Sequence, residues 1–301
     1  DRWSTNTTQA SKLSVQQNAG AVTPPAGFTN YLGITSLSSY SVVDADFFNF
    51  KQIIEANNVD DLGFGTANAQ DVTVSFWVRS SLTGDFGLIL TWGGLYANER
   101  DYPVLYNIAV ANTWEKKTIT IAGDTDIDTF GTNGYGFQVR FSLGGGATTA
   151  GTSGAWATAN SQSVTGQTSV VGTSGATFYI TGVQLEVGDT ATSFDYRPYG
   201  QELSLCQRYY YWNGGVNDVA FFNINSTNVG GSATYPVLMR ATPTIIIYNG
   251  TTSGQVSLIG GGTGTGVSAT VFSVQSIMAV AGTTMSGLGG VQFNYSASSE
   301  L

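Results

Sequence analysis

The chain has 301 residues, of which 42% are hydrophobic and 10% are charged, and its formal net charge is −9 with no histidine. This length allows about two domains with buried cores, and the scarcity of Lys and Arg disfavours nucleic-acid binding, which needs clustered basic side chains. The absence of histidine excludes Ser-His-Asp and Cys-His catalysis, the single Cys206 excludes an internal disulfide, and the lack of about 18 consecutive apolar residues excludes a membrane-spanning helix.

Short runs of alternating apolar and polar residues recur through the first two thirds of the chain. In Val72–Ser80, valine or phenylalanine occupies every second position up to Val78, which is typical of a strand with one buried face. No segment shows a helical period over about ten residues, so we predict an all-β sandwich. The other strands are predicted at Ala10–Gln17, Thr29–Leu37, Asp46–Ile54, Phe86–Thr91, Pro103–Val110, Glu115–Ile121, Gly136–Leu143 and Thr177–Val187.

Acidic residues cluster in turn-like contexts, at Asp44/Asp46, Asp60/Asp61 and Asp124/Asp126/Asp128. Two carboxylates facing each other across a groove can hydrolyse a glycosidic bond. The stronger interpretation is that Asp serves here as a turn residue that binds nearby backbone. We therefore predict no catalytic residue and no enzymatic activity.

The spacing of Asp124, Asp126 and Asp128 also resembles that of a calcium loop, because hard cations take spaced carboxylates. The EF-hand template fails, since Thr129 stands where glycine is required and Tyr135 where the bidentate Glu belongs. We expect no cofactor, and a loop calcium site is the weaker alternative.

Aromatic residues outside the predicted core strands are candidates for sugar contact, because a ring face stacks on the apolar face of a pyranose. The run from Trp92 to Tyr96 indicates a hairpin tip, and Trp156 lies within Gly144–Gly175, a long polar surface excursion with a predicted short strand near Ser169–Gly172. Local packing or a subunit contact is the alternative for each ring. The four candidates are Trp92, Tyr96, Tyr102 and Trp156.

The strand Thr177–Val187 changes phase at Gly182. Phe178 and Ile180 lie on one alternation phase, whereas Val183, Leu185 and Val187 lie on the other. One extra residue at a glycine predicts a β-bulge, which lets both sets face the same core.

The segment that follows carries a family resemblance. TGVQLEVG in this strand, followed by RPYG and LCQRYY, resembles a module of bacteriophage tail-fibre and virion surface proteins. The resemblance implies a carbohydrate-binding-module-like jelly roll over residues 1–200 and a smaller C-terminal β-sandwich-like domain, expected to be the oligomerisation unit, over 201–301. It also implies a virion location, contacts with other tail or fibre proteins, a homotrimer and a host surface glycan as ligand.

The C-terminal part is also predicted to be mostly β. Gln201–Cys206 is expected to form one helical turn, and Gln207–Trp212 a strand whose aromatic residues point both ways. Thr244–Tyr248 is apolar on both faces, as in a strand buried inside a sandwich or between subunits. The chain begins at Asp1 without methionine, so we expect it to be the distal piece of a longer polypeptide that ends naturally at Leu301.

Two other functions agree with the same sequence. The first is a secreted bacterial carbohydrate-binding or adhesin module, which an upstream signal peptide or catalytic domain would favour. The second is a polysaccharide-degrading tailspike, which two carboxylates at hydrolytic separation in a groove would favour.

Overall fold

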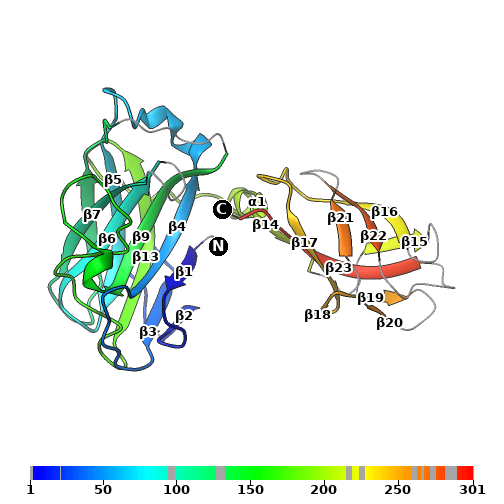
Figure 1. Cartoon of the computed structure of the whole chain (residues 1–301), viewed down its shortest axis with the longest axis horizontal. Helices are drawn as coiled ribbons and strands as arrows, with labels where there is room; N and C mark the ends of the chain where they lie inside the picture. Colours follow the sequence, from blue (N-terminus) through cyan, green and yellow to red (C-terminus); the bar gives the residue numbers. More distant parts are fainter. Residues whose placement is uncertain are drawn as a thin grey trace. The chain divides into compact units, whose positions relative to one another are not determined.

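The chain divides into two compact units, residues 2–195 and 196–300, which we call the N-terminal unit and the C-terminal unit. Almost all regular structure is β-strand, so the all-β fold class is confirmed (Figure 1). The division between the units falls after Asp195, and the sequence predicts it near Gly200. The computed structural model describes residues 3–20, 22–93, 99–126, 133–214, 219–223, 228–258, 263–265, 268–271, 276–281 and 290–300.

Two antiparallel sheets make the predicted jelly-roll sandwich of the N-terminal unit, and a short parallel pair, β10 (Ala150–Gly151) and β12 (Ser163–Val164), lies outside them. The six-stranded sheet has the order β1 (Trp3–Thr7), β4 (Phe47–Glu55), β9 (Tyr135–Gly145), β6 (Gly84–Trp92), β7 (Arg100–Ile108) and β11 (Ala157–Thr158). The five-stranded sheet has the order β2 (Leu13–Gln17), β3 (Leu32–Ser36), β13 (Thr177–Val187), β5 (Val72–Ser80) and β8 (Glu115–Ile121).

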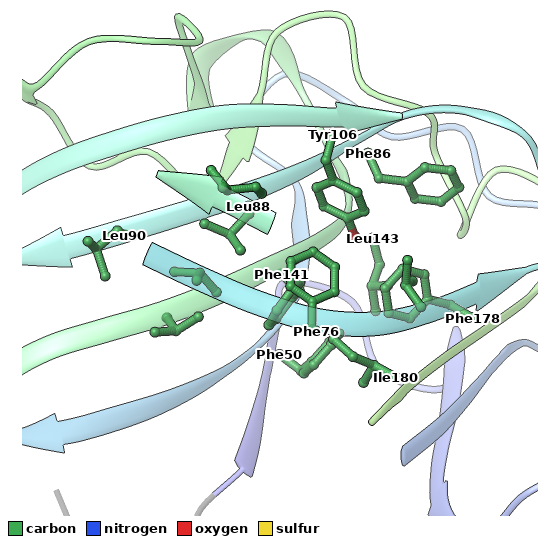
Figure 2. Packing of buried hydrophobic residues seen from close by; sticks show 14 of the residues in the cluster. Phe50, Phe76, Phe86, Leu88, Leu90, Tyr106, Phe141, Leu143, Phe178 and Ile180 are labelled. Atoms are coloured by element: carbon green, nitrogen blue, oxygen red, sulfur yellow. The ribbon is translucent and has the colours of Figure 1, made fainter. Parts of the chain in front are cut away.

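The apolar residues that alternate along each strand point inward and form the core between these sheets. Phe50 of β4 stacks on Phe141 of β9 with ring centroids 5.1 Å apart. Phe76 of β5 meets Phe141 edge to face at 5.0 Å, so aromatic contacts join the two sheets (Figure 2). Edge-to-face rings at this separation are favourable beyond the area they bury.

The C-terminal unit is organised around its last strand, β23 (Gly290–Ser298). The C-terminal half of β23 pairs with β14 (Tyr210–Trp212) and β17 (Thr244–Asn249), and its N-terminal half pairs with β15 (Val219–Asn223) and β19 (Gln255–Leu258). The remaining strands are β16 (Asn228–Thr234), β18 (Thr252–Ser253), β20 (Thr263–Thr265), β21 (Ser268–Val271) and β22 (Ser276–Ala281).

Helix α1 (Tyr199–Gln207) confirms the predicted helical turn and extends it in both directions. No helix within the described ranges is long and apolar enough to cross a membrane. Within the chain, strand β17 buries one face only, because Ile247 is buried whereas Ile246 is 45% exposed.

The bulge predicted in β13 is confirmed at Gly182. The register of β13 against β5 shifts between Thr181 and Gln184. Gly182 has a φ of 59°, in the left-handed region where only glycine is unstrained. The Phe28 ring occupies the space beside it, since a Cβ on Gly182 would lie 2.5 Å from Phe28 Cζ.

The shift keeps both halves of β13 on one core. Phe178 and Ile180 before it are buried, and Val183 and Leu185 after it pack against the same cluster. Val187 departs from the expectation, because it lies at the end of the strand and is 56% exposed.

Replacing Gly182 by valine should lower the free energy of unfolding by about 3 kcal/mol, because a β-branched residue is strained at positive φ and its Cβ would overlap the Phe28 ring. Thr181→Val is the matched control. It removes a hydrogen bond of 2.7 Å from the Thr181 hydroxyl to the Asn30 carbonyl, at a cost of about 1 kcal/mol. Chemical denaturation of the full chain measures both, and equal losses would contradict the role assigned to Gly182.

Candidate functional site

Most of the described candidate residues converge at one end of the N-terminal sandwich. Trp92 is the last residue of β6 and pairs with Arg100, the first residue of the neighbouring strand β7. Arg100 in turn pairs with Thr158 of β11, which brings the segment containing Trp156 to the same edge. Asp124, just beyond β8, completes the group through its bonds to Trp92 and Arg100.

Arg100 organises the polar part of this end. Its Nε donates to Asp124 Oδ2 at 2.7 Å, and its Nη2 forms an ion pair with Asp126 Oδ2 at 2.5 Å. Its Nη1 donates to Thr158 Oγ1 at 3.2 Å. The buried Asp124 carboxylate also accepts the Trp92 indole N–H at 2.8 Å and the Asp126 backbone N–H at 3.2 Å. Burial by itself would raise the pKa of Asp124, but the bonds from Arg100, Trp92 and Asp126 hold it below its usual value.

This geometry corrects the calcium interpretation. Both oxygens of Asp124 accept N–H donors, and Asp126 is paired with Arg100, so neither carboxylate is arranged as a metal ligand. Asp128 lies outside the described residues. Within the ranges the structure describes, no group of three His, Cys, Asp or Glu residues is placed to hold a metal ion.

In another of the acidic clusters, Asp46 is a turn residue that binds nearby backbone, as the sequence indicated. Asp46 Oδ2 accepts the Val43 backbone N–H at 3.1 Å and the Tyr40 hydroxyl at 2.7 Å. The bond from Val43, followed by that from Tyr40, lowers the pKa of Asp46 to about 2. Asp60 and Asp61 begin the short 3-10 helix η2 (Asp60–Leu62).

Trp92 is a core residue, which corrects its assignment as a sugar platform. Its side chain is 1% exposed and packs edge to face on Phe64 at 5.4 Å. A ring that is covered on both sides offers no face to a ligand. Tyr96, the other residue of the expected hairpin tip, lies outside the described residues.

Tyr102 and Trp156 are brought together and remain half-buried. Their ring centroids are 5.2 Å apart. The Trp156 indole N–H donates to the Ala122 carbonyl at 2.7 Å, and its ring meets Phe64 at 5.8 Å. Trp156 is therefore fixed in place. We call Tyr102 and Trp156, with Arg100 and Asp126 beside them, the aromatic rim.

The segment that carries Trp156 is held on the outer face of the six-stranded sheet. Asp101 accepts the Ser161 backbone N–H and the Thr91 hydroxyl, each at 2.6 Å. Arg140 donates to the Ser161 carbonyl, and Asn49 Nδ2 donates to Gln162 Oε1 at 3.1 Å. These buried groups form what we call the polar clasp: Asn49, Thr91, Asp101, Arg140, Ser161 and Gln162.

Further hydrogen bonds around Gln138 continue from Arg140 along the sheet. Lys51 Nζ and Arg140 Nη2 each donate to Gln138 Oε1 at 3.2 Å, and Gln138 Nε2 donates to Glu99 Oε1 at 3.2 Å. Burial raises the pKa of Asp101 and lowers the pKa of Lys51, because both charges are removed from water.

The expected excursion is therefore packed against the sheet along much of its length. Gly87 lacks a side chain where a Cβ would lie 2.8 Å from Val164, so the segment approaches the sheet closely. The predicted strand at Ser169–Gly172 is wrong. Val170 and Val171 lie in a turn instead, are fully buried, and complete the hydrophobic core.

Comparisons with known proteins give weak likenesses only. No family model and no curated protein matches the chain. A tailspike protein 4 enzymatically active domain from bacteriophage CBA120 is 13% identical, with a TM-score of 0.37, covering 62% of this chain and 19% of that one. A family 11 carbohydrate-binding module from Clostridium thermocellum, in complex with a mixed-linked tetrasaccharide, is 11% identical, with a TM-score of 0.32, covering 64% of this chain and 91% of that one.

A tandem CBM22-1–CBM22-2 domain from Paenibacillus barcinonensis Xyn10C is 9% identical, with a TM-score of 0.33, covering 98% of this chain and 85% of that one. The chain thus spans about a fifth of the tailspike chain and most of the two modules. At these identities and TM-scores the likenesses say nothing of ligand or activity.

Replacing Asp124 by alanine should lower the free energy of unfolding by about 3 kcal/mol, because it removes the acceptor of the Trp92 indole N–H and the buried partner of Arg100. Asp126→Ala removes the 68% exposed partner of the same guanidinium and should cost less than about 1 kcal/mol. Similar losses for the two variants in chemical denaturation would contradict this assignment.

The ion pair of Asp124 with Arg100 predicts that stability depends on pH. The folded-state pKa of Asp124 lies below its unfolded value, so its contribution is fully present above the unfolded pKa and is lost as pH falls through the folded one. The wild-type chain should therefore lose more stability on acidification below about pH 4 than Asp124→Ala does. If the free energies of unfolding of the two proteins fall in parallel with pH, Asp124 is not responsible for the loss of stability in acid.

Proposed function

We propose that the chain is a non-enzymatic, glycan-binding part of a bacteriophage tail fibre or comparable virion appendage, with the aromatic rim as its contact with host surface glycan. The observation that carries the binding proposal is the rim itself, where Tyr102 and Trp156 lie together beside the paired charges of Arg100 and Asp126. The resemblance of the TGVQLEVG and LCQRYY segments supports the virion location and the association with other tail proteins.

The rim supplies both kinds of contact that a sugar needs. Aromatic rings cover the apolar face of a pyranose, and charged side chains at the edge bind its hydroxyls. Asp126 is 68% exposed and so is accessible for such bonds. Trp156 is already fixed by its bond to the Ala122 carbonyl, so little side-chain freedom is lost on binding.

The rim carboxylate Asp126 and the buried Asp124 next to it support a binding role over hydrolysis. Hydrolysis of a glycosidic bond requires two carboxyl groups on opposite sides of that bond, one of them able to donate a proton. Asp124 is buried and held ionised by Arg100 and Trp92, and Asp126 belongs to the same ion pair. Neither carboxylate is arranged as a proton donor.

Replacing Trp156 by alanine should weaken glycan binding at least tenfold, about 1.4 kcal/mol. Trp114→Ala is a matched control, because Trp114 is also half-buried, donates its indole N–H to the Thr23 carbonyl at 2.8 Å and meets the Tyr31 ring at 6.0 Å. Both variants should lose similar stability, whereas only Trp156→Ala should lose binding. An array of bacterial surface polysaccharides identifies the ligand, and calorimetry measures the affinity.

Two outcomes would overturn the assignment of the rim. One is a wild-type chain that binds no polysaccharide on the array. The other is a loss of binding that is equal in Trp156→Ala and Trp114→Ala, since it would follow from lost stability alone.

The proposal includes assembly into a homotrimer through the C-terminal unit. Helix α1 buries none of its residues within the chain, and Leu203 and Leu205 on it are 40% and 41% exposed. Leu238 is 52% exposed in the same unit. Contiguous exposed apolar patches mark interaction surfaces, and we propose that these side chains contribute to one in the trimer. Residues 196–301 contain three basic and three acidic residues, so their copies do not repel one another by net charge.

Light scattering should give a mass about three times the 31.6 kDa of one chain at micromolar concentration. Leu203→Ser combined with Leu205→Ser should reduce that mass, because it places two hydroxyls in the contact. Val110→Ser is the control, since Val110 is 55% exposed in the N-terminal unit. A wild-type monomer would contradict the trimer.

A further inference from the structure

We propose a second carbohydrate site, on the C-terminal unit, that binds an uncharged pyranose and is independent of the aromatic rim. It is a surface hollow of about 490 Å³ lined by four residues. We call it the aromatic depression: Tyr210, Trp212, Tyr248 and Thr251.

Strand alternation places these rings outside. Tyr209 is buried and Tyr211 packs against the core of the C-terminal unit, which leaves Tyr210 and Trp212 on the opposite face. Tyr210 is 47% exposed and Trp212 is 37% exposed. Two aromatic residues are therefore displayed where the core makes no use of them.

The third ring comes from the other side of β23. Trp212 of β14 and Ile246 of β17 both pair with Ser296, so the two strands flank β23 there. Tyr248, two residues further along β17, shares the outward face of Trp212. Their rings meet edge to face at 4.8 Å, and the Tyr248 hydroxyl lies 3.4 Å from Ser296 Oγ. The rings are thus held by each other before any ligand arrives.

The chemistry of the lining selects an uncharged sugar. None of the four lining residues is charged, so a phosphate or carboxylate ligand would find no counter-ion among them. The rings offer apolar faces, and the hydroxyls of Tyr210, Tyr248 and Thr251 offer hydrogen bonds. A pyranose without ionised groups presents both complementary surfaces.

The volume of the depression, about 490 Å³, lies in the usual range of small-ligand sites. The site lies wholly within the C-terminal unit, so it does not rest on the proposed role of Trp156.

The test uses the full chain carrying Trp156→Ala, so that the rim contributes nothing. Methyl glycosides of glucose, galactose, mannose and N-acetylglucosamine are titrated, with saturation-transfer NMR as the readout, and an anionic sugar, methyl glucuronide, is included for comparison. We expect at least one uncharged glycoside to bind. Adding Trp212→Ala should weaken that binding at least tenfold, and adding Trp212→Phe should weaken it less, because a smaller ring remains.

Tyr196→Ala is the matched control, since Tyr196 is 60% exposed in the same unit but does not line the depression. The proposal is overturned if none of the uncharged glycosides binds, if methyl glucuronide binds best, or if Tyr196→Ala and Trp212→Ala weaken binding equally. It is also overturned if Trp212→Ala lowers the mass in light scattering while glycoside binding is unchanged, because a second copy of the chain then covers this face.

Discussion

The N-terminal sandwich depends on β13 keeping its apolar residues on one core across a change of phase. This strand lies between β3 and β5, so its register is transmitted to both neighbours. A regular strand would turn Val183 and Leu185 to the outside and leave the end of the core open. The extra residue at Gly182 avoids this, and the Phe28 ring uses the space that the missing side chain leaves. The bulge at Gly182 therefore keeps the apolar residues of β13 on the core and also leaves room for the Phe28 ring.

Local alternation predicted most of the strands, because each strand of a sandwich has one dry and one wet face. Val72–Ser80 and Thr177–Val187 have the predicted bounds. Strands without that contrast were missed: Trp3–Thr7 has one apolar residue, and Asn228–Thr234 contains two glycines. Which strands pair, and in what order, depends on contacts far apart in sequence that alternation does not encode.

The candidate site was predicted less well, for identifiable reasons. Trp92 continues the phase of Phe86, Leu88 and Leu90, so its burial was present in the sequence, and the glycines that follow it indicated a hairpin tip instead. Trp156 was found because an aromatic ring in a polar segment needs a partner. The partners of Arg140 and Asp101 were not predictable, since they depend on which distant segment covers the sheet.

The polar clasp restricts the motion of the glycine-rich segment 144–175. Its backbone is bonded to buried side chains of the sheet, at Ser161 through Arg140 and Asp101, and at Gln162 through Asn49. Releasing it would expose these charged and polar groups while breaking their bonds, so a separate opening of the segment is costly. Its amide hydrogens should consequently exchange with solvent together with those of β6 and β9, as one cooperative unit rather than as a loop.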